Sequence, residues 1–375
     1  MNIRKVTAAD LHLGMPMPWN VYGENGDLLM RKGHMLASPS QISSLVAEGV
    51  YEDYSGHSSV PASAVRKLNA AGLQLAGLLP LIEQGTAPQD VLARLDMVAR
   101  LVARAVAVDA DVAVASILHN QRSLPYSVRH SLNSAIIVHL LGQARQLAAQ
   151  DVHSLTLAAL TMNVGMQAQH QRLQDCSQEL CSADRAMVLA HCERSVELLR
   201  AAGVDDARWL ECVLHHHENE DGSGYPLRKS GAQIPPLARL LALADRYCAR
   251  VSERAYRKTM APNLALRDLL LDANVTVDGN LAPMLIRALG IYPVGTYVRL
   301  LNGEVAVVAR RGLQSTTPQV AAVLCPRSGP LARSEPRDTR SGVHGIRDAL
   351  TTAQAAALQA PPLRMELVWG RRAAV

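Results

Sequence analysis

Eleven consecutive residues constrain this chain more than any other feature. Residues 216–226 read His-His-Glu-Asn-Glu-Asp-Gly-Ser-Gly-Tyr-Pro. Imidazoles suit transition metals, and nearby carboxylates either bind a metal or orient its ligands. Gly222 and Gly224 allow the backbone to fold closely beside such a site. The run therefore predicts a metal site that is followed by a tight loop.

The chain around this run has a helical hydrophobic pattern. Between residues 64 and 289, apolar residues recur three and four positions apart, as at Leu132, Ile136 and Leu140. Helix breaks are expected at glycines and prolines, Gly77 and Pro80 among them. The pattern predicts a mainly α fold, with an all-α domain over residues 61–290.

Both ends of the chain have a different pattern. Residues 1–60 predict a small mixed α/β domain with a hairpin at Asn25-Gly26, followed by a short helix that ends at Gly49. Residues 291–375 predict a small β-rich extension with a hairpin at Asn302-Gly303 and a third strand at residues 320–324. Residues 326–345 are basic and rich in Gly, Ser and Pro, which predicts a mobile loop.

Composition limits the classes of function. The formal charge of +5 is modest, and aromatic residues make up 3% of the 375 residues with no phenylalanine, which argues against a nucleic-acid polymer as partner. The apolar stretches are too short for a membrane span, and the first residues lack the apolar segment of a signal peptide. The six cysteines are scattered, which favours reduced thiols and a cytoplasmic location.

The run at residues 216–226 resembles the signature of HD-GYP phosphodiesterases, bacterial metal hydrolases that open cyclic di-GMP. That signature is HHE, two free positions, DG, one free position, then GYP, and all eight fixed positions are present. The resemblance covers roughly residues 123–257. It implies an HD-domain helical bundle, and the first domain resembles the segment that often precedes HD-GYP domains.

The resemblance assigns metal ligands residue by residue. His130 matches the early histidine, and Asp245 matches the last ligand of the same first site. The second site is matched by His191, His216 and His217. The HD pair and its lysine, however, fall on Met162, Asn163 and Met166.

These replacements change the expected chemistry. The aspartate of the HD pair bridges two metals in the family, whereas the neutral Asn163 amide offsets no repulsion between two cations. A thioether at Met162 prefers softer metals, and Met166 supplies no positive charge for a phosphate. We expect no intact catalytic centre. The second site keeps three imidazoles, so it holds one Fe, Mn or Zn ion or, as the alternative, none.

The remaining residues of the region have expected supporting roles. Glu218 and Asp221 orient the histidines and the loop, which also contains Gly222, Gly224, Tyr225 and Pro226. By resemblance, this loop docks a diguanylate cyclase (GGDEF) domain. Lys229, Arg254 and Arg257 are candidate phosphate contacts. Asp245 lies on an apolar helix and needs a partner, either a metal, Arg246 or another cation.

Three functions remain open from the sequence. The leading hypothesis is a catalytically inactive or strongly impaired HD-GYP regulator that binds cyclic di-GMP or a partner protein. The second is an active phosphodiesterase that uses a residual metal site. The third is a scaffold whose metal site is vestigial.

Overall fold

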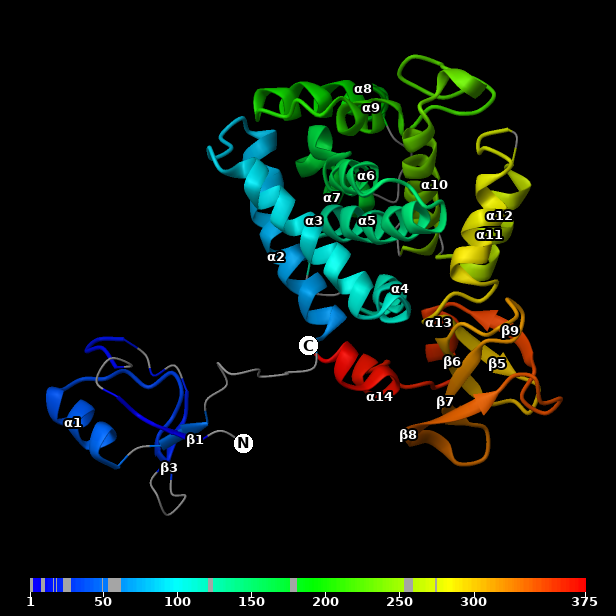
Figure 1. Cartoon of the computed structure of the whole chain (residues 1–375). Helices are drawn as coiled ribbons and strands as arrows, with labels where there is room; N and C mark the ends of the chain where they lie inside the picture. The colour runs from blue at the N-terminus through cyan, green and yellow to red at the C-terminus, as the bar shows by residue number, and fades with distance from the viewer. Residues whose placement is uncertain are drawn as a thin grey trace. The chain divides into compact units, whose positions relative to one another are not determined.

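The computed structural model describes residues 3–7, 11–15, 17, 19–22, 28–48, 50–52, 62–120, 124–175, 181–252, 259–273 and 275–375. The chain divides into two compact units, Met1–Ala62 and Ser63–Val375 (Figure 1). Each unit has its own hydrophobic core. Within the described residues, no helix combines the length and apolar character that crossing a membrane requires.

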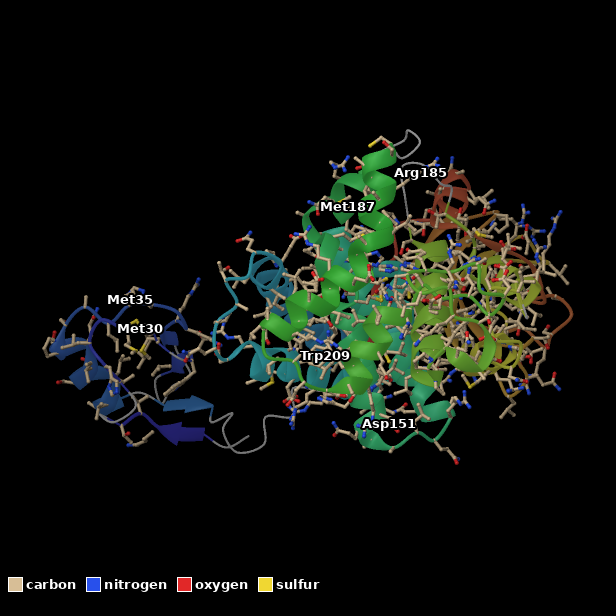
Figure 2. All side chains as sticks on the ribbon, turned by 90° about the horizontal axis from the view of Figure 1, so that it is seen from above. Met30, Met35, Asp151, Arg185, Met187 and Trp209 are labelled. Atoms are coloured by element: carbon tan, nitrogen blue, oxygen red, sulfur yellow. The ribbon has the colours of Figure 1, made fainter. Side chains whose placement is uncertain are left out.

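The first unit is a small antiparallel sheet with one helix. Its strands are β1 (Ile3–Lys5), β2 (Val21–Tyr22), β3 (Leu28–Met30) and β4 (Val50–Glu52), in the order β1-β4-β2-β3. The antiparallel pairing of β2 with β3 agrees with the predicted hairpin. The turn at Asn25-Gly26 itself lies outside the described residues. Met30 packs against the core of this unit, whereas Met35 is exposed (Figure 2).

The helix of this unit confirms the expected short helix, although its predicted end at Gly49 lies outside the described residues. α1 covers Pro39–Glu48. The Gln41 side chain accepts from the Ser38 backbone N–H at 3.2 Å, and the Ser38 hydroxyl accepts from the Gln41 N–H at 3.4 Å. This reciprocal pair is a capping box, which satisfies N–H groups that the first turn leaves without helical partners.

The second unit begins with a helical body, as the hydrophobic pattern predicts. Its helices are α2 (Ala64–Glu83), α3 (Val91–Val108), α4 (Ala110–His119), α5 (Tyr126–Ala144), α6 (Ala149–Thr161), α7 (Gln167–Asp175), α8 (Ser182–Ala201), α9 (Ala207–His215), α10 (Pro236–Val251), α11 (Pro262–Leu271) and α12 (Leu281–Leu289). α5 packs against α2, α3, α6 and α10, and most of its residues are buried. A helix that is enclosed in this way can hold polar side chains such as His130 inside the protein.

The expected helix break at Gly77 and Pro80 is wrong. α2 continues through both residues to Glu83. Pro80 stands in the last turn, where its ring removes the N–H that would bond to the Ala76 carbonyl. Leu75 and Leu79 are fully buried, so tertiary packing of this face outweighs the local cost.

The end of the chain forms an antiparallel sheet against the helices. Its strands are β5 (Tyr297–Leu300), β6 (Val305–Arg310), β7 (Gln319–Cys325), β8 (Gly329–Asp338) and β9 (Ile346–Leu350), in the order β8-β7-β6-β5-β9. The hairpin at Asn302-Gly303 and the strand at 320–324 are confirmed as β5, β6 and β7. Three short helices follow, α13 (Thr352–Ala357), α14 (Met365–Trp369) and η4 (Gly370–Ala373).

The stretch 326–345, expected to be a mobile loop, instead contains the edge strand β8. It pairs with β7 from Gln319↔Asp338 to Cys325↔Gly329. Pro330 and Pro336 are tolerated because an edge strand does not need every N–H for pairing. One of the basic residues, Arg337, is paired with an acid, since it forms two hydrogen bonds to the Glu304 carboxylate at 2.8 and 2.9 Å.

The helical body and the sheet share one hydrophobic core. Charged contacts join them as well, because Asp109 accepts from Arg310 at 2.7 Å and from Arg372 at 3.1 Å. His119 binds the Gly295 carbonyl at 2.7 Å. The predicted class, mainly α with a β-rich end, is confirmed. The division at residue 290 stays a prediction, because residues 63–375 form one compact unit.

Candidate metal centre

Three histidines converge from two segments of the helical body. His191 belongs to α8, and His216 and His217 directly follow α9. Their ligand nitrogens all lie within 4.8 Å of one another. The structure therefore brings together the residues predicted for the second site, named here the three-histidine cluster.

Backbone carbonyls fix the orientation of two of these rings. Nδ1 of His191 donates to the Val188 carbonyl at 2.6 Å, and Nδ1 of His216 donates to the Val213 carbonyl at 2.7 Å. Each ring therefore keeps an Nε2 lone pair for a ligand. The two Nε2 atoms face each other at 3.4 Å. Two lone pairs at this distance repel each other unless a proton or a metal ion lies between them.

The environment keeps the cluster neutral. Burial lowers the pKa of His191 and of His217, and it lowers the pKa of His216 to about 3. Neutral imidazole is the form that binds a metal. Donor type, orientation and protonation state therefore all fit one transition metal ion.

The two residues predicted for the first site bind each other. His130 Nε2, on α5, donates to Asp245 Oδ1, on α10, at 2.7 Å. Burial alone would raise the pKa of Asp245, but the hydrogen bond from His130 and the potential of the nearby histidines lower it well below its usual value. His130 is therefore the partner that Asp245 needs. Arg246 instead binds the Thr276 carbonyl and the Asn219 side chain.

Residues 162–166, where the resemblance places the HD pair, lie between α6 and α7 and pack against α8. The Ser195 hydroxyl donates to the Met162 carbonyl at 3.0 Å and accepts from the Gly165 N–H at 2.9 Å. A Cβ on Gly165 would lie 2.7 Å from the His191 carbonyl oxygen, so only glycine fits this approach. Met162, Asn163 and Met166 are all buried. Asn163 Oδ1 has no hydrogen-bond partner among the described residues.

The loop after His217 folds back onto the cluster. A Cβ on Gly224 would lie 2.4 to 2.6 Å from three backbone atoms of residues 217–219, so this close return requires glycine. The Glu218 carboxylate accepts from the Leu227 and Lys229 N–H groups at 2.7 and 2.9 Å. Asp221 accepts from the N–H and hydroxyl of Ser223. The two carboxylates thus hold the loop rather than a ligand.

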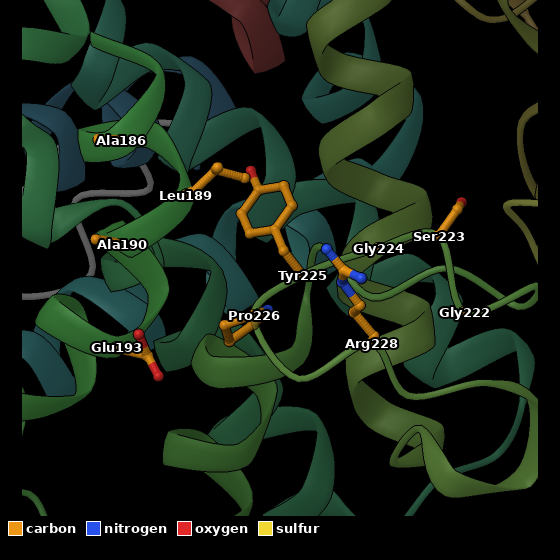
Figure 3. A pocket seen from close by; sticks show the side chains of 10 residues that line it. All are labelled: Ala186, Leu189, Ala190, Glu193, Gly222, Ser223, Gly224, Tyr225, Pro226 and Arg228. Carbon is orange, nitrogen blue, oxygen red and sulfur yellow. The ribbon is translucent and has the colours of Figure 1, made fainter. Parts of the chain in front are cut away.

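The aromatic side chain of the loop lies beside the cluster. The Tyr225 ring stacks on His217, with centroids 4.8 Å apart and an interplanar angle of 24°. A cavity of about 600 Å³ lies between α8 and the loop residues from Gly222 to Pro226. Figure 3 shows Tyr225 in this cavity beside Leu189, with Arg228 on the loop side.

The candidate phosphate contacts are only partly placed. Lys229 Nζ donates to His215 Nε2 at 3.1 Å. Arg254 and Arg257 lie outside the described residues. A phosphate role for these three residues stays a prediction.

Sequence reasoning missed two groups near these sites. His170, on α7, lies edge-on to His130 with ring centroids 5.7 Å apart. Cys192 Sγ lies 3.6 Å from His191 Nε2, and burial raises the pKa of this thiol well above its usual value. α7 is a polar helix without a clear apolar stripe, so no periodic signal places His170. Cys192 follows a predicted ligand directly, and this adjacency was the available signal.

Comparison with known proteins gives the same fold. Residues 98–281 match the family model described as an HD domain. The cyclic di-GMP phosphodiesterase PA4108 of Pseudomonas aeruginosa is 32% identical over 219 residues, 58% of this chain and 52% of the relative. The cyclic di-GMP phosphodiesterase PdeB of Borreliella burgdorferi is 23% identical over 186 residues, 50% of this chain and 49% of the relative. The match thus spans about half the length of these relatives.

A solved structure agrees over a larger share of the chain. Bd1817, an HDG"Y"P protein from Bdellovibrio bacteriovorus, has a TM-score of 0.52 with 13% identity and covers 76% of this chain and 98% of that one. At this identity the likeness shows the fold. The helical body therefore contains a match to an HD domain, and it shares its fold with an HD-GYP-like protein.

Proposed function

We propose that this chain is a regulator in cyclic di-GMP signalling that binds the dinucleotide and hydrolyses it very slowly or not at all. The relatives PA4108 and PdeB are named cyclic di-GMP phosphodiesterases, which supports the ligand class. The observation that carries the loss of activity is the HD segment, where Met162 and Asn163 replace the pair that bridges two metals. The cysteines that the structure describes are free thiols, which supports a cytoplasmic location.

The physical argument concerns the number of metals. A phosphodiester displacement in a two-metal site uses both ions to stabilise the attacking and leaving oxygens. Asn163 offers a neutral oxygen, and His130 and Asp245 are already bonded to each other. We infer at most one ion, Fe, Mn or Zn, at the three-histidine cluster. When bound, it would supply Lewis-acid activation of a phosphoryl oxygen, without a second ion to complete the clamp.

The test compares the chain with a variant in which the family residues are restored. Cyclic di-GMP is incubated with purified protein and Mn²⁺ or Fe²⁺, and linear dinucleotide and GMP are measured. We expect saturable binding by calorimetry and turnover at least about 100-fold below that of Met162→His/Asn163→Asp. Turnover of the unchanged chain equal to that of the double variant, and abolished by His217→Ala, would contradict the proposal.

A slow one-metal phosphodiesterase is the second candidate. It is favoured by the facing Nε2 atoms of His191 and His216 at 3.4 Å, since these suit one bound ion. Metal analysis after chelation and reloading distinguishes the candidates. Stoichiometric metal with measurable turnover supports slow catalysis, metal or dinucleotide binding without turnover supports the regulator, and neither supports a scaffold with a vestigial site.

Docking of a diguanylate cyclase (GGDEF) domain to the loop is a further part of the proposal. Leu227 follows the Gly-Tyr-Pro turn, and about half of it is exposed. We expect Leu227→Asp to abolish binding of a purified GGDEF domain while leaving metal content unchanged. Leu271→Asp, at another exposed leucine on α11, is the matched control. Equal binding by both variants would exclude the loop as the docking surface.

A further inference from the structure

The three imidazoles of the cluster differ in how they are oriented. His191 and His216 each donate from Nδ1 to a carbonyl three residues earlier in the chain. His217 follows the end of α9 and is partly exposed. Its ring contacts three other rings, with centroid distances of 4.2 Å to His216, 4.8 Å to Tyr225 and 5.1 Å to His191. Stacking therefore contributes to the orientation of this third ring.

The loop backbone fixes the ring of Tyr225. The Tyr225 N–H donates to the His217 carbonyl at 3.2 Å, so the two residues are also joined through the main chain. Gly224 allows this contact, because any side chain there would collide with residues 217–219. Glu218 then holds the segment that leaves the loop, by accepting hydrogen bonds from the Leu227 and Lys229 N–H groups. The position of the Tyr225 ring over His217 is thus built into the loop.

We propose that Tyr225 is a positioning residue that holds the His217 ring in the orientation needed for metal binding at the three-histidine cluster. Stacked aromatic rings favour near-parallel, offset contact, and the 24° angle between these two rings is of that kind. Groups that orient metal ligands typically affect metal affinity by one to two orders of magnitude. This inference rests on the proposed metal centre and gives the tyrosine of the signature a role that does not require hydrolysis.

The chain contains a matched control. Tyr126 stacks on His130 with centroids 5.5 Å apart and an angle of 23°, close to the geometry of Tyr225 on His217. His130, however, lies outside the three-histidine cluster and binds Asp245. Replacing either tyrosine by leucine removes a ring while keeping an apolar side chain. Tyr126→Leu therefore reports the general cost of losing such a stack.

The experiment measures Co²⁺ binding by chelator competition and by the visible spectrum of the bound ion. We expect Tyr225→Leu to weaken Co²⁺ affinity about tenfold and to alter the spectrum, with Tyr225→Phe and Tyr126→Leu within twofold of the unchanged chain. Unchanged affinity in Tyr225→Leu would overturn the proposal. An equal loss in Tyr225→Phe would also overturn it, because the hydroxyl rather than the ring would then be the cause.

A second readout does not depend on metal. In metal-free protein with ¹³C-labelled histidine, the His217 ring signal is assigned by its disappearance in His217→Gln. We expect this signal to shift and broaden in Tyr225→Leu, but not in Tyr225→Phe or Tyr126→Leu. An unmoved signal overturns the positioning role. A chain that takes up no Co²⁺, yet shows the shift, refutes the metal centre while supporting the ring contact.

Discussion

Restoring the aspartate of the HD pair should make the stability of this protein depend on metal. In Met162→His/Asn163→Asp the new carboxylate replaces an amide that is 4% exposed and whose oxygen has no partner among the described residues. His130 is already bonded to Asp245. Without metal, the new charge is buried and unpaired, which costs about 3–5 kcal/mol.

This cost can be converted into a melting temperature. For a unit of this size, 1 kcal/mol corresponds to roughly 2 °C, so the double variant should melt roughly 6–10 °C below the unchanged chain in a chelator. Each ion at 100 times its dissociation constant adds about 2.7 kcal/mol. The unchanged chain gains at most one ion and the double variant two, so Mn²⁺ should raise the melting temperature of the variant about 5 °C more.

Differential scanning calorimetry at pH 7.5 with and without Mn²⁺, together with metal analysis, measures both effects. Met162→His alone is the control, because it adds an imidazole without a bridging carboxylate. Equal melting of the double variant and the unchanged chain in chelator would refute the burial argument. If Mn²⁺ raised the melting temperature of the two proteins equally, this would refute the hypothesis that residues 162 and 163 decide whether a second metal binds.

Three further predictions follow from single contacts. Gly224→Ala should lower the free energy of unfolding by about 1–3 kcal/mol and weaken metal binding, because its Cβ would meet three backbone atoms at 2.4 to 2.6 Å; Gly77→Ala, at an open helical position, should be neutral or stabilising in the same denaturant titration. The depressed pKa values of His191, His216 and His217 mean that the unfolded chain binds more protons than the folded one below about pH 6.5. Stability of the metal-free protein should therefore fall as the pH drops from 6.5 to 5, by up to about 1.4 kcal/mol per pH unit for each histidine, and a flat profile would contradict neutral burial. Asp109→Ala should cost about 3 kcal/mol, because Asp109 caps α4 and is the buried partner of Arg310 and Arg372; an unfolding transition unchanged by this variant would contradict that role.

The sequence anticipated the parts of the fold that depend on neighbouring residues. Period and capping predicted the helical body and α1, and turn residues predicted the hairpin of β5 and β6. Local reasoning failed at Pro80 and at residues 326–345, where composition indicated a break and a loop. In both places packing or strand pairing with distant residues outweighs local preference, and no local pattern contains that information.

The candidate site divides in the same way. The spacing of the signature predicted that His216, His217 and the glycine turn lie together, because these residues are close in the chain. The family pattern added His191, and the structure brings it into the cluster. The hydrogen-bond partner of Asp245 was less predictable. It binds His130, which is 115 residues away, rather than the adjacent Arg246.

The sequence by itself determined which chemical groups this protein has: three imidazoles, a glycine turn, and a methionine and an asparagine at the predicted position of the HD pair. Tertiary structure decided what those groups contact. Helix packing joins His130 to Asp245, brings His170 beside His130, and sets the Tyr225 ring on His217. Such contacts depend on the relative placement of whole helices and loops, which side-chain identity at single positions does not specify.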